Sequence, residues 1–260
     1  MPNPFQNTKY FIVDMDGTFY LDGHIIPAAD SFLDCLAEQG RDFYFFTNNS
    51  SNNVESCGEK LAAMGYPVSP EKIILSSQVA IDYLQRQHAG KSVYLLGNER
   101  LTADMEAAGI PLTQARPDIV LLGFDTTLTY QKIWDAARYI AEGARYIATH
   151  PDINCPTAEG FMPDTGSMIA LFAASTGKRP TVLGKPMTYT VDYITARLGC
   201  NREDLAFVGD RLETDIAIGA NHGIPTALVL SGVTTAEHYA QSDIRADAVV
   251  DRLADLRNLA

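Results

Sequence analysis

The sequence has 260 residues, of which 46% are apolar and 20% are charged, and its 32 acidic and 20 basic side chains leave a formal net charge of −12 at pH 7. This length and composition are typical of a globular protein with one large domain or two smaller ones. The negative charge argues against nucleic acids and anionic membrane surfaces as partners.

The first predicted element is a short strand, Tyr10–Val13, whose continuous apolar run is typical of a strand buried on both faces of a parallel sheet. It ends on Asp14 and Asp16, and alternate side chains of an extended chain point the same way, so both carboxylates are expected to face one cleft while Met15 turns inward. Two carboxylates this close repel each other and need a cation or a proton between them, and Mg²⁺ is the natural occupant. An ordinary Asp-Gly turn would explain Asp16 and Gly17 but not Asp14.

An amphipathic helix is predicted over Ala28–Gln39, followed by a second strand, Phe43–Phe46, that leads into Thr47-Asn48-Asn49-Ser50-Ser51. A strand–helix–strand unit of this length forms a right-handed parallel crossover, so both strands end at the same sheet edge, where ligands bind. The hydroxyl, amide and backbone N–H groups of this polar loop suit a phosphate group. The alternative is a loop that only caps the next helix, which runs to about Met64.

A further strand and helix, Ile73–Leu75 and Gln78–Gln87, precede a second series of alternating elements. Its predicted strands are Val93–Leu96, Ile119–Leu122 and Tyr146–Thr149, and its predicted helices are Glu99–Ala108, Tyr130–Glu142 and Ser167–Ser175. The block has no low-complexity linker or repeat and is long enough for a domain of its own.

The last strand of this block leads into Thr149-His150-Pro151-Asp152. Pro151 and Asp152 favour a turn, which is where a loop presents side chains to a ligand. One interpretation places His150 near a bound ligand. The alternative is that His150 only hydrogen-bonds its own turn.

Two later strands also deliver polar residues at their ends. In Val182-Leu183-Gly184-Lys185-Pro186 the lysine lies in a tight turn directly after an apolar run, which favours a placed cation over a solvated surface charge. In Leu205–Gly209 the strand is followed by Asp210, a third carboxylate at the same edge, and then by Asp215. A helix N-cap is the alternative for Asp215, because the helix Ile216–Asn221 follows it. The remaining predicted elements are the helix Thr188–Leu198 and the strands Thr226–Leu230 and Ala248–Val250.

Taken in chain order, the stretches Asp14-Met15-Asp16-Gly17-Thr18, Thr47-Asn48-Asn49-Ser50-Ser51, Gly184-Lys185-Pro186 and Gly209-Asp210 with Asp215 resemble the motifs of the haloacid dehalogenase (HAD) superfamily of phosphatases, in its NagD-like branch, subfamily IIA. The resemblance implies an α/β fold with a Rossmann-like parallel sheet core formed by residues 1–78 and 181–260. It further implies an inserted α/β cap domain of the C2 type at residues 79–180.

The implied activity is a Mg²⁺-dependent phosphatase that hydrolyses small phosphorylated metabolites, such as a sugar phosphate, a nucleotide or p-nitrophenyl phosphate, through an aspartyl-phosphate intermediate. Asp14 is the implied nucleophile, since a carboxylate is already ionised at pH 7, and Asp16 the implied general acid and base. By the same resemblance, the metal ligands are Asp14, the backbone carbonyl of Asp16 and Asp210, with Asp215 as an outer support. The implied substrate contacts are Thr47, Asn48, Asn49 and Lys185 for the phosphate, and His150, which stands where similar proteins often carry Asn, for the leaving group.

Two other functions remain as alternatives. A phosphomutase is a related enzyme. A receiver-like phospho-aspartate regulatory module also groups acidic residues, a hydroxyl and a lysine at a parallel sheet edge, but such modules are about half this length, lack an inserted domain and have no task for Asp16 as an acid.

The four cysteines, Cys35, Cys57, Cys155 and Cys200, include no CxxC pair, which argues against zinc and a disulfide framework. Residues 1–10 contain no apolar signal segment, and no apolar run approaches membrane-spanning length. We therefore expect a cytoplasmic protein without a membrane partner. A homodimer is among the oligomeric states that the sequence leaves open.

Overall fold

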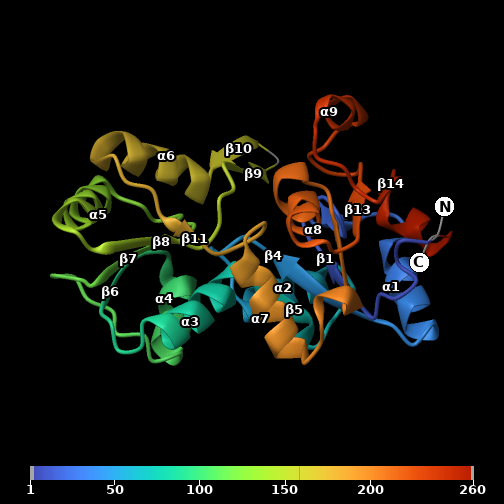
Figure 1. Cartoon of the computed structure of the whole chain (residues 1–260), viewed down its shortest axis with the longest axis horizontal. Coiled ribbons are helices and arrows are strands. Elements are labelled where there is room, and N and C mark those ends of the chain that lie inside the picture. Colours follow the sequence, from blue (N-terminus) through green and yellow to red (C-terminus); the bar gives the residue numbers. More distant parts are fainter. Residues whose placement is uncertain (1–2, 158, 259–260) are drawn as a thin grey trace. The chain divides into compact units, whose positions relative to one another are not determined.

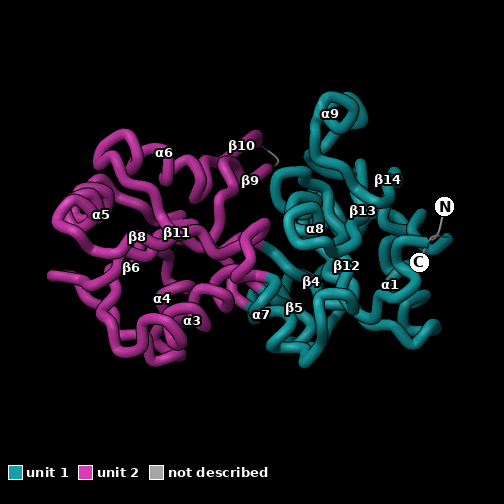
Figure 2. Tube along the Cα trace, viewed as in Figure 1, with its two compact units in different colours: residues 1–47, 54–74, 191–260 teal, residues 48–53, 75–190 magenta. Residues whose placement is uncertain are grey.

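The computed structural model describes residues 3–157 and 159–258 (Figure 1). The outermost residues of the expected segments 1–78 and 181–260, and residue 158 of the expected cap, lie outside that description. The chain divides into two compact units (Figure 2). The first comprises the chain up to Thr47, Val54–Ile74 and the chain from Val191; the second comprises Asn48–Asn53 and Leu75–Thr190.

The first unit is built on a six-stranded sheet in the order β14-β13-β12-β1-β4-β5. Its strands are β1 (Tyr10–Val13), β4 (Asp42–Thr47), β5 (Ile73–Leu75), β12 (Leu205–Gly209), β13 (Thr226–Val229) and β14 (Ala248–Val250). The pairs β14–β13, β13–β12, β12–β1 and β1–β4 are parallel, and Val13 lies opposite both Val208 and Phe45. The carboxyl ends of these strands therefore meet at one edge of the sheet, which confirms the predicted parallel core.

Helices and short turns connect these strands. They are α1 (Ala29–Glu38), α2 (Val54–Ala63), η1 (Pro70–Lys72), α7 (Thr188–Leu198), η2 (Arg202–Asp204), the π-helical turn η3 (Leu212–Ile216), α8 (Ala217–His222), α9 (Ala236–Gln241) and η4 (Leu253–Asn258), with a small hairpin of β2 (Tyr20–Leu21) and β3 (His24–Ile25). Helix α1 forms as its periodicity predicts: Phe32, Leu33 and Leu36 are buried, and Phe32 packs edge-on against Phe11 with 5.6 Å between ring centroids. Gly40, at φ 69°, then leaves the helix in the left-handed region.

The second unit contains a four-stranded sheet in the order β11-β8-β7-β6. Its strands are β6 (Val93–Leu96), β7 (Ile119–Leu122), β8 (Arg145–Ala148) and β11 (Thr181–Val182), and the pairs are parallel. Its helices are α3 (Ser76–Gln87), α4 (Glu99–Ala107), α5 (Tyr130–Glu142) and α6 (Thr165–Thr176). The core between the sheet and helices α5 and α6 includes Tyr94, Tyr139, Tyr146 and Phe172.

Three features of the second unit differ from the sequence-based expectation. The antiparallel hairpin of β9 (Asn154–Thr157) and β10 (Gly160–Pro163) was not expected, because each strand contains a proline and neither shows a regular apolar alternation. Helix α6 begins two residues earlier than expected, directly after its N-cap Asp164. Strand β11 pairs with β8, so the compact second unit extends to Thr190. Within the described residues, no helix has both the length and the apolar character needed to cross a membrane.

Candidate active site

Three carboxylates gather at the carboxyl ends of two neighbouring strands of the first unit. Asp14 follows β1, Asp210 follows β12, and Asp215 lies in the π-helical turn η3. One carboxylate oxygen from each lies within 4.8 Å of the others. Asp210 and Asp215 are 0% and 2% exposed, and Asp14 is half-buried. The sequence predicted that Asp14 and Asp210 meet here, and Asp215 joins the same cluster.

Glycines allow the backbone to approach these carboxylates closely. A Cβ atom at Gly232 would lie 2.0 Å from Oδ2 of Asp210, and one at Gly17 would lie 2.5 Å from the same atom. A Cβ atom at Gly209 would lie 2.2 Å from Cγ of Asp215. Real Cβ atoms do not approach other atoms so closely, so any side chain at these three positions would displace a carboxylate.

Backbone N–H groups support the two buried carboxylates. Val233 N donates to Asp210 Oδ2 over 2.6 Å, and Arg211 N donates to Asp215 Oδ2 over 3.1 Å. The loop that carries Val233 is also tied to the first strand's turn, because Ser231 Oγ donates to Gly17 O over 2.7 Å. This loop was not predicted from the sequence. The signal was present, since the loop follows the carboxyl end of a predicted strand of the same sheet.

This carboxylate cluster fits a hard divalent cation. Carboxylates gathered in a largely buried site repel one another, and a cation bound between them relieves that repulsion. Carboxylate oxygens are the ligands that Mg²⁺ prefers. Asp14, Asp210 and Asp215 therefore have the chemistry and the proximity that such an ion requires.

The Asp16 carboxylate lies outside this cluster and has its own partners. Tyr20 donates its hydroxyl to Asp16 Oδ2 over 2.8 Å, and Lys60 Nζ lies 3.3 Å from Asp16 Oδ1. Met15, between the two aspartates, is fully buried, as the alternation of side chains predicted. Burial, and after it the charge of the nearby Asp16, raise the pKa of Tyr20, so this phenol stays protonated and remains a donor. Neither Tyr20 nor Lys60 was predicted as a site residue from the sequence.

The predicted phosphate loop connects the two units. Thr47 is the last residue of β4 and is 7% exposed, whereas Asn48 begins the part of the loop that belongs to the second unit. Within that unit the Asn48 side chain joins Lys185 through two backbone bonds: Lys185 N donates to Asn48 Oδ1 over 2.9 Å, and Asn48 Nδ2 donates to Lys185 O over 3.1 Å. Lys185 is buried at 3% exposure. Asn49 accepts from Ser51 N over 2.9 Å, which shapes the loop locally.

The second unit holds His150 in a chain of buried hydrogen bonds. His150 is 0% exposed, its Nε2 lies 2.9 Å from Asp164 Oδ1, and its Nδ1 lies 2.9 Å from Thr149 Oγ1. Thr149 Oγ1 in turn lies 3.0 Å from Ser50 Oγ, which accepts from Phe124 N over 2.9 Å. This geometry favours the alternative in which the imidazole serves its own turn and its neighbours.

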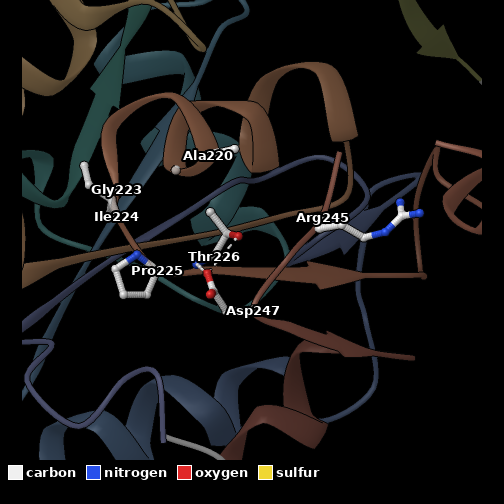
Figure 3. Close-up of a pocket in the computed structure, with 8 residues that line it drawn as sticks. Ala220, Gly223, Ile224, Pro225, Thr226, Arg245 and Asp247 are labelled. Carbon is white, nitrogen blue, oxygen red and sulfur yellow. Dashed lines mark hydrogen bonds between the residues drawn. The ribbon is translucent and has the colours of Figure 1, made fainter. Parts of the chain in front are cut away.

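A pocket of about 310 Å³ in the first unit lies away from the predicted residues (Figure 3). It adjoins Thr226, at the amino end of β13, whereas the aspartates follow carboxyl ends. Thr226 N donates to Asp247 Oδ2 over 2.8 Å, and the Arg245 side chain extends away from both (Figure 3). The described lining residues include none of the predicted site residues.

The chain is similar to known proteins over most of its length. Residues 11–111 match the family described as haloacid dehalogenase-like hydrolase, and residues 182–256 match the family described as HAD-hydrolase-like. A dihydroxyacetone phosphatase of Corynebacterium glutamicum is 34% identical over 95% of this chain and 90% of its own length. A 4-nitrophenylphosphatase from Thermotoga maritima, known from its crystal structure, is 41% identical in sequence and superposes with a TM-score of 0.93. The match covers 97% of this chain and 97% of that one. A structure described as a putative NagD protein is 39% identical with a TM-score of 0.92, over 97% of this chain and 98% of its own.

Proposed function

The chain belongs to the haloacid dehalogenase-like hydrolases, in their NagD-like branch, and is a phosphatase of small phosphate esters; on that premise we propose that Asp14 performs the first step of the reaction. The observation that carries the proposal is the cluster of Asp14, Asp210 and Asp215, with carboxylate oxygens within 4.8 Å of one another. In the proposed reaction an Asp14 oxygen attacks phosphorus, and the bond from phosphorus to the ester oxygen breaks. Water then attacks the phosphorus of the aspartyl-phosphate, which releases inorganic phosphate and restores Asp14.

Asp16 is the proposed proton donor and acceptor. Its carboxyl gives a proton to the leaving ester oxygen and then takes one from the attacking water. Support comes from the position of its side chain, which is partly exposed and bonded to Tyr20 and Lys60, apart from the buried carboxylate cluster. A carboxylate placed in this way can change its partners without disturbing that cluster.

Mg²⁺ is the proposed cofactor. Asp14, Asp210 and the backbone carbonyl of Asp16 would hold it, with Asp215 as the adjacent support. When bound, the ion screens the repulsion between the anionic nucleophile and the anionic phosphate. The proposal is supported by the three clustered carboxylates, which are the hard oxygen ligands that this ion prefers.

The remaining predicted residues are proposed to bind the phosphoryl group. The Thr47 hydroxyl, the N–H groups of the loop from Asn48 and the Lys185 ammonium supply donors for its equatorial oxygens. Asn48 fixes the Lys185 backbone from both sides, which supports a defined position for this cation. We further propose that the second unit is the cap, that it selects the leaving group, and that triose and other sugar phosphates are the substrate class, as the name of the Corynebacterium relative suggests.

A phosphate-release assay tests this function. The purified protein is mixed with Mg²⁺ and p-nitrophenyl phosphate, then with a panel of triose, hexose, glycol and nucleoside phosphates. Sustained release of inorganic phosphate from p-nitrophenyl phosphate, and a preference for sugar phosphates within the panel, are the expected results. Conversion of a hexose phosphate into an isomer with the phosphoryl group on another of its hydroxyls, without release of phosphate, would indicate a phosphomutase and contradict the proposal. A single stoichiometric phosphorylation of the protein without turnover would indicate a regulatory module and contradict the proposal.

A further inference from the structure

The Asp16 carboxylate is held at both of its oxygens by side chains of the same unit. Tyr20 Oη donates to Oδ2 over 2.8 Å, and Lys60 Nζ lies 3.3 Å from Oδ1. These two partners reach Asp16 from different elements: Tyr20 begins β2, only four residues later in the chain, and Lys60 lies on α2, 44 residues away. Such a convergence on one half-exposed carboxylate calls for an explanation beyond packing.

Tyr20 is a rigid support for this contact. Its side chain is 2% exposed, and its backbone is tied into the turn that follows Asp16, since Gly17 N donates to Tyr20 O over 2.8 Å and Tyr20 N donates to Met15 O over 3.1 Å. The phenol oxygen is therefore positioned by the same turn that carries the aspartate. A hydrogen bond from a fixed donor restricts the rotation of the carboxylate about its last bond.

Lys60 completes a closed group of three side chains. Its ammonium lies 4.0 Å from the centroid of the Tyr20 ring, so it contacts the aromatic face and the carboxylate at the same time. Unlike Tyr20, it is accessible to solvent: its side chain is 42% exposed, and that of Asp16 is 46% exposed. The contact at Oδ1 is thus the longer and more exposed of the two.

We infer that Tyr20 and Lys60 are positioning residues for Asp16: Tyr20 fixes Oδ2, and Oδ1, on the Lys60 side, is the oxygen that exchanges protons with the leaving group and with water. The inference rests on the proposed function of Asp16 as general acid and base. Proton transfer requires one carboxylate oxygen in line with the ester oxygen, and a freely rotating carboxylate spends only part of its time there. A fixed Oδ2 leaves a single oxygen for the task, and the exposed Lys60 contact is the one that a leaving group can replace.

The test measures how the rate depends on the leaving group. Values of kcat and KM are determined for a series of ring-substituted phenyl phosphates and an alkyl phosphate, with the wild type, Tyr20→Phe, Lys60→Met, Asp16→Ala and the double variant of Asp16→Ala with Tyr20→Phe. For esters with poor leaving groups we expect Tyr20→Phe to lower kcat/KM, which reports the step that expels the leaving group, by roughly 10-fold, below the ~10²–10⁴-fold typical of losing a general acid. For p-nitrophenyl phosphate, which needs little protonation, kcat/KM should change less than 3-fold (about 0.6 kcal/mol). The value of kcat also contains the attack of water on the aspartyl-phosphate, which is the same for all esters, so kcat is not used to compare leaving groups.

Lys60→Met should also lower the activity more for esters with poor leaving groups than for esters with good ones, but by a smaller factor than Tyr20→Phe does. In the Asp16→Ala background the Tyr20 substitution should have no further effect, because the group that Tyr20 positions is then gone. Equal losses of kcat/KM for all esters in Tyr20→Phe, an unchanged dependence of kcat/KM on the leaving group in both single variants, or an added loss of kcat/KM in the double variant would overturn the inference. If the dependence of kcat/KM on the leaving group is no steeper in Asp16→Ala than in the wild type, the proposed role of Asp16 as the acid fails instead, and the two failures are distinguished.

Two control variants match the chemistry of these substitutions elsewhere in the chain. Tyr139→Phe removes a phenol hydrogen bond, to Gln114 O at 2.7 Å, from a side chain that is 4% exposed. Lys72→Met removes a lysine that pairs with Asp42 and lies 4.5 Å from the centroid of the Tyr44 ring, at the amino end of β4. Both should leave the leaving-group dependence unchanged. If Tyr20→Phe unfolds at a lower temperature than these controls, the exposed Lys60→Met still decides the outcome.

Discussion

At the scale of single residues, the carboxylate cluster depends on glycines, which leave room for the carboxylates that a Cβ atom would displace. Gly232 has an ordinary φ angle, yet a Cβ atom there would lie 2.0 Å from Asp210 Oδ2 and 2.5 Å from Asp210 Cγ. The constraint is therefore steric and not conformational. The same argument applies to Gly209, which faces Asp215.

Gly232→Ala should consequently displace the Asp210 carboxylate and lower kcat/KM by roughly 100-fold, the effect typical of a 1 Å misplacement in an active site. The unfolding free energy should fall by about 1–3 kcal/mol, as is usual for overpacking. Gly58→Ala, within helix α2, is the matched control, because the nearest atom to its new Cβ would be Ile73 Cδ1 at an ordinary van der Waals distance of 3.8 Å. Steady-state kinetics and urea unfolding measure both effects. Full activity in folded Gly232→Ala would show that the Asp210 position is not critical.

The residues that the sequence reveals differ physically from those it conceals. Asp14 and Asp210 were predictable because each directly follows an apolar strand, and parallel strands bring their carboxyl ends together. Tyr20 and Lys60 were not, since an aromatic residue in a turn and a lysine on an exposed helix face are common in any globular protein. Only the fold brings Lys60 to Asp16, across 44 residues of sequence.

At the scale of elements, the second unit organises its loops through His150. The imidazole joins the N-cap of α6, Asp164, to the loop after β8, and Thr149 continues the connection to Ser50. The sequence predicted the turn at Pro151 and Asp152, but it could not decide between a ligand contact and a structural bond. The hydrogen bond that favours the structural interpretation depends on the position of Asp164, which is 14 residues away along the chain.

His150→Ala should remove one buried hydrogen-bond partner each from Asp164 and Thr149 and open a cavity, which should lower the unfolding free energy by roughly 2–4 kcal/mol. The remaining folded protein should lose activity equally on p-nitrophenyl phosphate and on a sugar phosphate. His24→Ala, at an exposed position in β3, is the control and should change stability by less than about 0.5 kcal/mol. Unchanged stability combined with a loss confined to the sugar phosphate would restore His150 as a leaving-group contact.

The helices and strands also differ in how well the sequence predicts them. The strands of the first unit's sheet were predictable from their apolar runs. The π-helical turn η3 was not expected: the sequence predicted a regular helix, Ile216–Asn221, preceded by Asp215 as an outer support of the metal site or as a helix cap. The position of Asp215 against Gly209 depends on contacts and not on periodicity. The hairpin of β9 and β10 has prolines in both strands and no amphipathic pattern, so local sequence carries little information about it.

At the scale of the whole molecule, a chain of net charge −12 is proposed to bind anionic esters at a site with three carboxylates. Such a site is electrostatically costly without a cation, so ion binding should be linked to stability. The wild-type melting temperature should rise with Mg²⁺, because a ligand at 100 times its Kd adds about 2.7 kcal/mol to the unfolding free energy.

Asp210→Asn should respond to Mg²⁺ differently from the wild type. Without metal this variant should be at least as stable as the wild type, since one repelling charge is removed, and it should gain little from Mg²⁺. A chelator should abolish turnover of the wild type, and added Mg²⁺ should restore it. Differential scanning calorimetry with and without the ion measures the linkage. A melting temperature that does not respond to Mg²⁺ in the wild type would argue against a metal at these carboxylates.

The most direct test of the account asks whether phosphate is ever attached to Asp14. The enzyme is mixed with ³²P-labelled p-nitrophenyl phosphate and Mg²⁺, quenched in acid within milliseconds, and digested for peptide mapping. We predict a hydroxylamine-sensitive label on the peptide that contains Asp14, a larger amount of it in Asp16→Ala because water attack on the intermediate is slowed, and none in folded Asp14→Asn. Phosphate release without any labelled protein in Asp16→Ala, or a label on a residue other than Asp14, would contradict the account.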